Sequence, residues 1–435
     1  MNWKRRIKDF LIRLIWGNRL YNLILKRIDR YIVEVKPSSS FQTEEIPLNK
    51  VCRFSDIKNQ LWSKGFDDLL FPKIPSLFHR KIWEFCQIIY GLRKLKRLHP
   101  NAVALGVGCG HEELMYFLSN RVKKVYAIDL YRDKYLGGEA EEDVIEKPEK
   151  YAPFKFRKEC LEIRRMDARD LKFEDNTFDF CFSLSAIEHM GGKRSKLKAL
   201  KEIYRVLKPG GVFAFTTELI LNKLGRGRSY FRLEELLNLC KNAGFEIVGD
   251  LSTSIEEEFS SPPLALPMES NRTPHVILRN FNSIYTSFSL FLSKREISSD
   301  IMAQIGEETD IPPIPYCYKA KMEFVKFPER VIGGEGIKII LKIKNMGDAP
   351  WYRNGGHSHM VRLGIKIFER DKSVELPHFP LPEDIFPGEE KIVEIEIPPM
   401  NLKGKVLFHF DLVKELCFWF EEKGSKPIKK EIELL

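Results

Sequence analysis

The sequence contains no run of about 18 uninterrupted apolar residues, so we expect no transmembrane helix in it. It has no CxxC pair among its eight cysteines, and its nine histidines are dispersed. This spacing disfavours a disulfide framework or a zinc site and is typical of a reducing compartment, so we expect no metal. The apolar residues near the N-terminus are interleaved with Arg and Lys, which is unlike a signal peptide. These absences predict a cytoplasmic protein.

The net charge of +10 is concentrated at the N-terminus. Residues 1–36 contain ten Lys or Arg against three Asp or Glu, and their apolar residues recur at three- and four-residue steps. A cationic amphipathic helix can lie in a membrane interface and attract anionic lipid. We therefore expect peripheral contact with an anionic membrane on its inner face; alternatively, the apolar stripe packs on the protein's own core. The remainder is nearly neutral, so no specific nucleic-acid partner is expected.

A chain of 435 residues is long enough for two or three domains. Strand, turn and helix patterns alternate from Ala102 to about Lys294, which predicts an α/β domain with a mostly parallel sheet. From about Lys319, period-two alternation between Gly, Pro and Asn turns predicts an all-β sandwich of immunoglobulin-like type. We assign five parts: a basic amphipathic segment, a helical lead-in, the α/β domain, a linker and the sandwich, at residues 1–50, 51–98, 99–295, 296–318 and 319–435.

A glycine-rich turn follows the first buried strand of the α/β domain. Gly106, Gly108 and Gly110 form a G-x-G-x-G pattern, and glycine lets the backbone turn sharply and approach a ligand closely. The next strand ends at Asp129, whose carboxylate can accept both hydroxyls of a ribose. This pair of features predicts a nucleotide cofactor and leaves NAD and S-adenosylmethionine both open.

Three later motifs follow in order. They are Met166-Asp-Ala, a strand with Ser183-Leu-Ser-Ala-Ile-Glu-His189, and a helix that runs into Leu207-Lys-Pro-Gly-Gly-Val-Phe213. The whole series resembles class I S-adenosylmethionine-dependent methyltransferases of the small-molecule type. The resemblance covers roughly Ala102 to Lys294 and implies a Rossmann-like fold with a mostly parallel seven-stranded sheet.

The resemblance also implies a set of cofactor-binding residues. Asp129 would hold the ribose, Asp167 and the Ala168 backbone would meet the adenine, and the three glycines would admit the methionine part. Many relatives carry an acid where Gly106 stands, and we expect Glu112 to supply that lost carboxylate near the cofactor's amino group. Alternatively, Glu112 is a helix N-terminal acid favoured by the helix dipole. The expected set is Gly106, Gly108, Gly110, Glu112, Asp129, Leu130, Asp167, Ala168 and Ser183.

Acceptor chemistry is expected beyond the carboxyl ends of the strands, where ligands bind in open parallel sheets. Glu188 and His189 follow the fourth strand, and Glu218 follows the fifth. His189 is the predicted general base because its ordinary pKa lies near neutrality, and Glu218 is expected to hydrogen-bond a hydroxylated acceptor. Alternatively, these three residues have structural roles, such as holding a loop in place. The charged connection from Tyr131 to Phe156 is interpreted as a lid.

Absent motifs narrow the acceptor. No Asn/Asp-Pro-Pro-aromatic sequence follows the fourth strand, and no Pro-Cys nucleophile is present, which disfavours amino-directed base methylation and cytosine C5 methylation. The sandwich loosely resembles modules of surface-polysaccharide enzymes, chiefly through Asp411–Glu415 and Trp419-Phe420. We therefore predict O-methylation of a sugar or lipid-linked glycan. Another small metabolite such as a quinone or lipid precursor, RNA, or a non-catalytic scaffold role are the alternatives.

Overall fold

The computed structural model describes most of the chain beyond the N-terminal segment. The described residues are 45–70, 78–131, 142–222, 229–253, 264–265, 275–295, 308, 311–328, 330–331, 336–354, 360–369, 372–400, 404–415 and 417–434. The helices expected within residues 1–36 lie outside these ranges. Among the described residues, no helix has both the length and the apolar character needed to cross a membrane. Two compact units are present, and each is described by itself.

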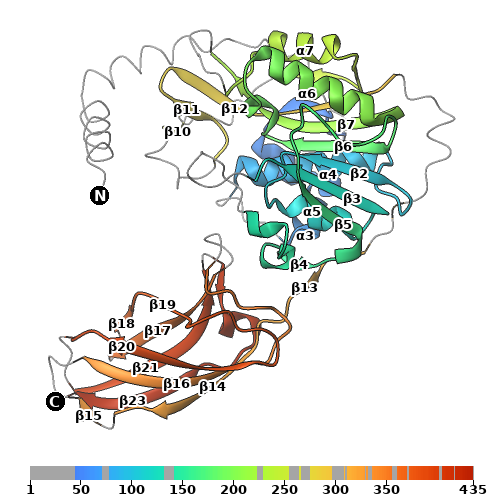
Figure 1. Ribbon diagram of the computed structural model, residues 1–435. Helices are drawn as coiled ribbons and strands as arrows, with labels where there is room; N and C mark the ends of the chain where they lie inside the picture. The colour runs from blue at the N-terminus through green and yellow to red at the C-terminus, as the bar shows by residue number, and fades with distance from the viewer. Residues whose placement is uncertain are drawn as a thin grey trace, which may run out of the picture. The chain divides into compact units, whose positions relative to one another are not determined.

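The first unit comprises Met1–Glu141 and Arg157–Pro312. Its central parallel strands lie in the order β5-β3-β2-β6-β7 (Figure 1). The strand β12 pairs antiparallel with β7 along nine residues, from Tyr285↔Ile220 to Ser293↔Val212. The bounds of these strands are Val103–Val107 for β2, Lys124–Asp129 for β3, Leu161–Arg165 for β5, Phe178–Leu184 for β6, Leu207–Ile220 for β7 and Ser283–Ser293 for β12.

Short strands cover the far edge of β12. These are β1 (Asn49–Val51), β8 (Glu246–Ile247) and β11 (Leu278–Asn280), all antiparallel to it. With β9 (Leu251–Ser252) and β10 (Leu264–Ala265) the sheet has eleven strands. The sheet therefore has more strands than the expected seven. The strands β5, β3, β2, β6, β7, β12 and β8 make seven, and β1, β9, β10 and β11 add four more.

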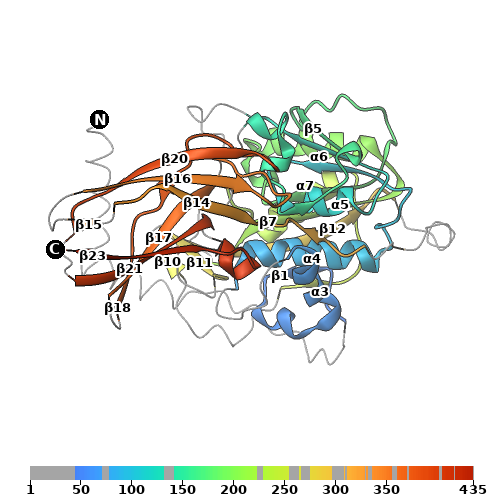
Figure 2. The ribbon, with the colours of Figure 1, turned by 90° about the horizontal axis from the view of Figure 1, so that it is seen from below.

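Helices lie on both faces of this sheet, as Figure 2 shows. The helices α6 (Lys193–Val206) and α7 (Leu233–Asn242) pack apolar side chains against Phe213, Phe215 and Leu290. The helix α4 (Arg80–Lys94) lies against the opposite face, where its Glu84 bonds Thr216. The remaining helices are α3 (Gln60–Asp68), which packs on α4, and α5 (Glu113–Ser119), which follows the glycine turn.

The second unit comprises Glu142–Phe156 and Pro313–Leu435. Alternating apolar residues of two sheets enclose one hydrophobic cluster that includes Trp351, Phe408 and Phe410, so a β-sandwich is present. One sheet has the order β14-β16-β20, and the other β15-β23-β21-β17-β18 with β19 and β22 at its side. The bounds are Ala320–Lys326 for β14, Arg330–Val331 for β15, Ile337–Asn345 for β16, Val361–Glu369 for β17, Lys372–Glu375 for β18, Phe379–Pro380 for β19, Glu390–Ile397 for β20, Gly404–Lys414 for β21, Phe418–Trp419 for β22 and Ile428–Leu434 for β23.

Residues 142–156 belong to the second unit, although they lie between two strands of the first. Their strand β4 (Phe154–Lys155) pairs with β13 (Ile314–Pro315), and Lys155 forms a salt bridge of 2.5 Å with Asp348. Phe154 is fully buried. Part of the expected lid therefore belongs with the second unit, where Lys155 has its charge partner. A lid over the cofactor stays a prediction, and residues 132–141 lie outside the described ranges.

Candidate active site

The glycine turn joins β2 to α5 at the carboxyl edge of the sheet. Gly108 has φ +70° and Gly110 has φ +50°, a left-handed conformation that strains any residue with a side chain. The backbone N–H of Gly110 donates to Asp129 Oδ2 at 3.0 Å, and the N–H of Leu130 donates to Asp129 Oδ1 at 2.6 Å. The end of β3 therefore orients its carboxylate against the turn, as a ribose-binding acid requires.

The three glycines do not have equivalent surroundings. A Cβ on Gly106 would lie 2.2 Å from Cys109 Sγ and 2.5 Å from the ring of Phe182. Gly106 is thus required by packing inside the protein, and its expected contact with the cofactor stays a prediction. A Cβ on Gly108 would lie 2.4 Å from the Cβ of Ala186. This places the glycine turn directly beside the segment that carries Glu188 and His189.

Glu112 stands at the N-cap of α5. Its Oε2 is buried and has no hydrogen-bond partner among the described residues. Burial raises the pKa of Glu112 well above its ordinary value, and the charge of Lys81 opposes that shift. An unpartnered carboxylate oxygen beside a lysine matches the two charges of an α-amino acid. These residues therefore fit the methionine end of S-adenosylmethionine.

Two expected cofactor residues have partners within the protein. Ser183 is buried in β6, and its hydroxyl donates to the carbonyl of Val107 at 2.7 Å, so it links two neighbouring strands; its expected contact with the cofactor stays a prediction. Asp167 is half-exposed and forms an ion pair with Arg169, whose Nε donates to both carboxylate oxygens at 2.9 and 3.0 Å. Ala168 is buried next to it, and its backbone stays the candidate for adenine contact.

A fully buried carboxylate organises the face of the sheet beneath α4. Glu84 is 0% exposed and accepts hydrogen bonds from five side chains. Its donors are Arg80 (3.0 Å), Lys81 (3.0 Å), Ser185 (2.9 Å), Thr216 (3.0 Å) and Ser287 (2.5 Å). Burial alone would raise the pKa of Glu84, but the charges of Lys81 and Arg80 and these hydrogen bonds outweigh it and lower the pKa. We call Glu84 and its donors the Glu84 network.

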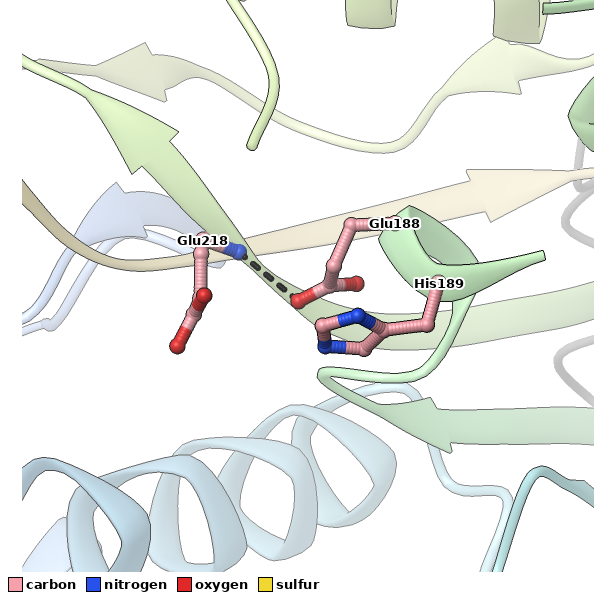
Figure 3. A group of neighbouring side chains, drawn as sticks. All are labelled: Glu188, His189 and Glu218. Atoms are coloured by element: carbon pink, nitrogen blue, oxygen red, sulfur yellow. Dashed lines mark hydrogen bonds between the residues drawn. The ribbon is translucent and has the colours of Figure 1, made fainter. Parts of the chain in front are cut away.

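The three predicted acceptor-side residues come together at the edge of the sheet (Figure 3). The Nε2 or Nδ1 of His189 and one carboxylate oxygen each of Glu188 and Glu218 lie within 4.8 Å of one another. The backbone N–H of Glu218 donates to Glu188 Oε1 at 3.1 Å, and Arg80 Nη2 donates to Glu218 Oε1 at 2.6 Å. We call Glu188, His189 and Glu218 the edge triad.

The edge triad combines two buried acids with an exposed imidazole. Burial and the charge of Glu218 raise the pKa of Glu188 to about 8. Burial also raises the pKa of Glu218, against the charge of Arg80. Ser185, which begins the segment that leads to the triad, has φ +48°, and such backbone strain in a residue other than glycine is concentrated at functional sites.

Sequence reasoning missed the contribution of α4. Arg80 and Lys81 precede Glu84 by four and three residues, a spacing that in a sequence is typical of exposed ion pairs on one helix. Nothing in the sequence indicates that Glu84 is buried against β7 and β12. The same is true of Ser287, which is remote in sequence from every motif of the cofactor site.

This strand order, the left-handed glycine turn and the acid at the end of the second strand define a nucleotide-cofactor-binding α/β domain. Residues 105–215, from β2 to within β7, match the family model described as "Methyltransferase domain". This part of the chain is therefore a methyltransferase domain of the class I type, with S-adenosylmethionine as its cofactor.

Individual relatives are distant. The sterol 24-C-methyltransferase of Aspergillus fumigatus is 31% identical over 140 residues, which are 28% of this chain and 35% of that protein. Cycloartenol-C-24-methyltransferase 1 of Oryza sativa is 31% identical over 125 residues, which are 25% and 35% of the two chains. The chain thus spans about a third of the length of these relatives. A solved methyltransferase from Methanosarcina mazei is 19% identical, with a TM-score of 0.31, over 45% of this chain and 94% of its own.

Proposed function

We propose that this protein transfers the methyl group of S-adenosylmethionine to a hydroxyl oxygen of a sugar or lipid-linked glycan in surface-polysaccharide biosynthesis. The proposal rests mainly on the polar character of the acceptor side. The edge triad lies beside the glycine turn, and the Glu84 network lies next to the triad. Polar groups placed in this way suit an acceptor rich in hydroxyls, because a buried polar group needs a hydrogen-bond partner.

S-adenosylmethionine supplies the methyl group as an electrophilic sulfonium. The acceptor oxygen would form a bond to the methyl carbon as the sulfur–methyl bond breaks and its electron pair passes to sulfur. The hydroxyl proton would pass to the edge triad, through the imidazole of His189. Asp129 would hold the ribose, Glu112 and Lys81 the amino-acid end, and the edge triad would position the hydroxyl and favour loss of its proton. The sequence predicts His189 alone as the general base, and we propose that Glu188 and Glu218 act in this step together with it.

Resemblance supports the glycan part of the proposal, and the sandwich, which we take as immunoglobulin-like, would engage the glycan or another assembly protein. A lipid precursor is the second candidate, because the sterol methyltransferases are related in sequence over part of the domain. An apolar acceptor would expose the acids of the triad to hydrocarbon without hydrogen bonds, which is costly. Transfer of labelled methyl to isolated glycans and to sterol or quinone precursors separates the two candidates.

The cofactor site is tested by calorimetric titration of S-adenosylmethionine into wild type, Asp129→Asn and Asp129→Ala. Loss of two charge-assisted hydrogen bonds to the ribose costs roughly 3 kcal/mol, so we expect affinity to fall about 100-fold. Asp170→Asn, which changes an exposed acid nearby, is the matched control and should bind as wild type does. Equal affinity of wild type and Asp129→Ala would refute this cofactor site.

We propose further that residues 1–36 hold the protein at an anionic membrane surface. Their excess of basic residues supports this, since each Lys or Arg near an anionic surface contributes about 1 kcal/mol. Flotation with anionic liposomes, with and without residues 1–36, provides the test. Equal recovery of the two forms would contradict the proposal.

A further inference from the structure

We propose that the edge triad binds a divalent cation of the Mn²⁺ type, with Glu188, His189 and Glu218 as its protein ligands. This goes beyond the proposed function, because a cation can bind there whatever the acceptor is. The sequence predicts no metal, since its cysteines form no CxxC pair and its histidines are dispersed.

The first argument is geometric. One ligand atom from each residue lies within 4.8 Å of the other two. Two ligands at about 2.1 Å from one ion lie at most about 4.2 Å apart, so movements of about half an ångström bring the three onto a common centre. Figure 3 shows the imidazole of His189 and the carboxylate of Glu218 extending from different elements toward the same space, with the carboxylate of Glu188 beside them.

The second argument is a ligand atom without a partner. Glu188 is 1% exposed, and its Oε2 has no hydrogen-bond partner among the described residues, while its Oε1 accepts the N–H of Glu218. Within the described ranges, no Lys or Arg forms a salt bridge with Glu188, because Arg80 pairs with Glu84 and Glu218. The charge of Lys81 acts on Glu188 and lowers its pKa, but Lys81 forms its salt bridge with Glu84. A buried carboxylate oxygen without a hydrogen-bond donor is costly, and a metal ion bound there removes the cost.

The third argument concerns the kind of ion. Two carboxylates are ligands typical of Mg²⁺ and Mn²⁺, whereas imidazole favours transition metals. The mixed set therefore fits Mn²⁺ better than Mg²⁺ or Ca²⁺. Three protein ligands leave coordination positions for water or for an acceptor hydroxyl, and an ion in contact with a hydroxyl lowers its pKa.

Electron paramagnetic resonance of Mn²⁺, titrated into the full chain after treatment with a chelator, tests the site. We expect one bound Mn²⁺ per chain. His189→Ala removes an exposed side chain and should preserve the fold, and Glu188→Gln keeps the shape of a buried one. Both should weaken Mn²⁺ binding by more than about 100-fold, because loss of a direct ligand exceeds the 10- to 100-fold effect of outer-shell changes.

Glu234→Gln, which alters an exposed acid in the first turn of α7, is the matched control and should bind Mn²⁺ as wild type does. Absence of binding to wild type, or equal binding by wild type and both triad variants, would overturn the site. Calorimetry with S-adenosylmethionine on the same samples separates this proposal from the proposed function. Methyl transfer to a glycan by a protein that binds no Mn²⁺ would support the proposed function and contradict the cation site. Mn²⁺ bound by wild type but not by the triad variants, without any methyl transfer, would support the cation site and contradict the proposed function.

Discussion

Glu188 in the first unit and Asp411 in the second are both buried carboxylates, but their oxygens have different partners. Asp411 accepts the backbone N–H groups of Leu412 and Glu421, one on each oxygen, at 2.8 Å each. Glu188 has one such bond and one oxygen without a partner. Burial raises the pKa of Asp411 to about 6 and, together with the charge of Glu218, that of Glu188 to about 8.

The comparison separates Asp411, whose hydrogen bonds stabilise the fold, from Glu188, which we propose to be a ligand of a cation. In the sandwich, Asp411 joins β21 to the 3-10 helix Phe420–Lys423 by accepting the backbone N–H of Glu421, and its second oxygen accepts the N–H of Leu412. At the sheet edge, Glu188 retains an unused oxygen beside His189 and the cofactor turn. Natural proteins tolerate an unsatisfied buried group mainly where function requires it.

The largest effect on stability is expected for Glu84→Gln in the first unit. The substitution removes the negative charge that compensates Arg80 and Lys81, and a buried charge left without its partner costs about 3–5 kcal/mol. Urea unfolding followed by far-UV circular dichroism measures it. A loss below about 1 kcal/mol would mean that Glu84 does not hold α4 against the sheet and would weaken the contrast between the two units.

A smaller effect is expected for Asp411→Asn in the second unit. An amide has one acceptor oxygen where the carboxylate has two, so one of the two backbone N–H groups loses its partner at a cost of about 1–3 kcal/mol. Urea unfolding followed by tryptophan fluorescence reports this loss, because Trp351 is in the core of the sandwich. Affinity for S-adenosylmethionine should stay unchanged; a change of more than about threefold would show that Asp411 also serves the cofactor site.

The smallest effect is expected from a pH-dependent pair at the start of α4. His79 and His275 are stacked with ring centroids 4.0 Å apart, and burial lowers their pKa values to about 3 and about 4. The unfolded chain takes up protons below about pH 6.5, whereas the folded chain keeps both rings neutral until about pH 4. Unfolding therefore binds protons in this window, and stability falls as pH decreases from about 6.5 to 4.

His275→Phe keeps a stacked ring and removes the proton site. Between pH 7 and pH 5 the variant should lose about 1 kcal/mol less stability than wild type, a value reduced for partial solvent screening. Urea midpoints at the two pH values provide the measurement, and equal pH dependence of the two proteins would contradict the role of His275. Its partner His79 accepts the N–H of Lys81, so acidification should loosen the first turn of the helix that supplies the Glu84 network.

Much of the first unit could be predicted from the sequence because its signals are local. The glycine turn, Asp129 and the alternation of strands and helices depend on neighbouring residues and on the periodicity of each element. The sandwich was predicted for the same reason, through the alternation along Ile337–Asn345 and Val361–Glu369. The additional strands at the far edge of β12 were not, because segments of two or three residues show no period.

What only the tertiary structure decided was the set of partners. The Arg80–Glu218 pair joins residues 138 positions apart, and the Ser287–Glu84 bond joins residues 203 positions apart. The close packing of Gly106 against Phe182 and the hydrogen bond from Ser183 to Val107 also exist only in the folded chain. The physical reason is that periodicity along a chain records which face of an element is buried, whereas hydrogen bonding and charge compensation depend on which elements meet after folding.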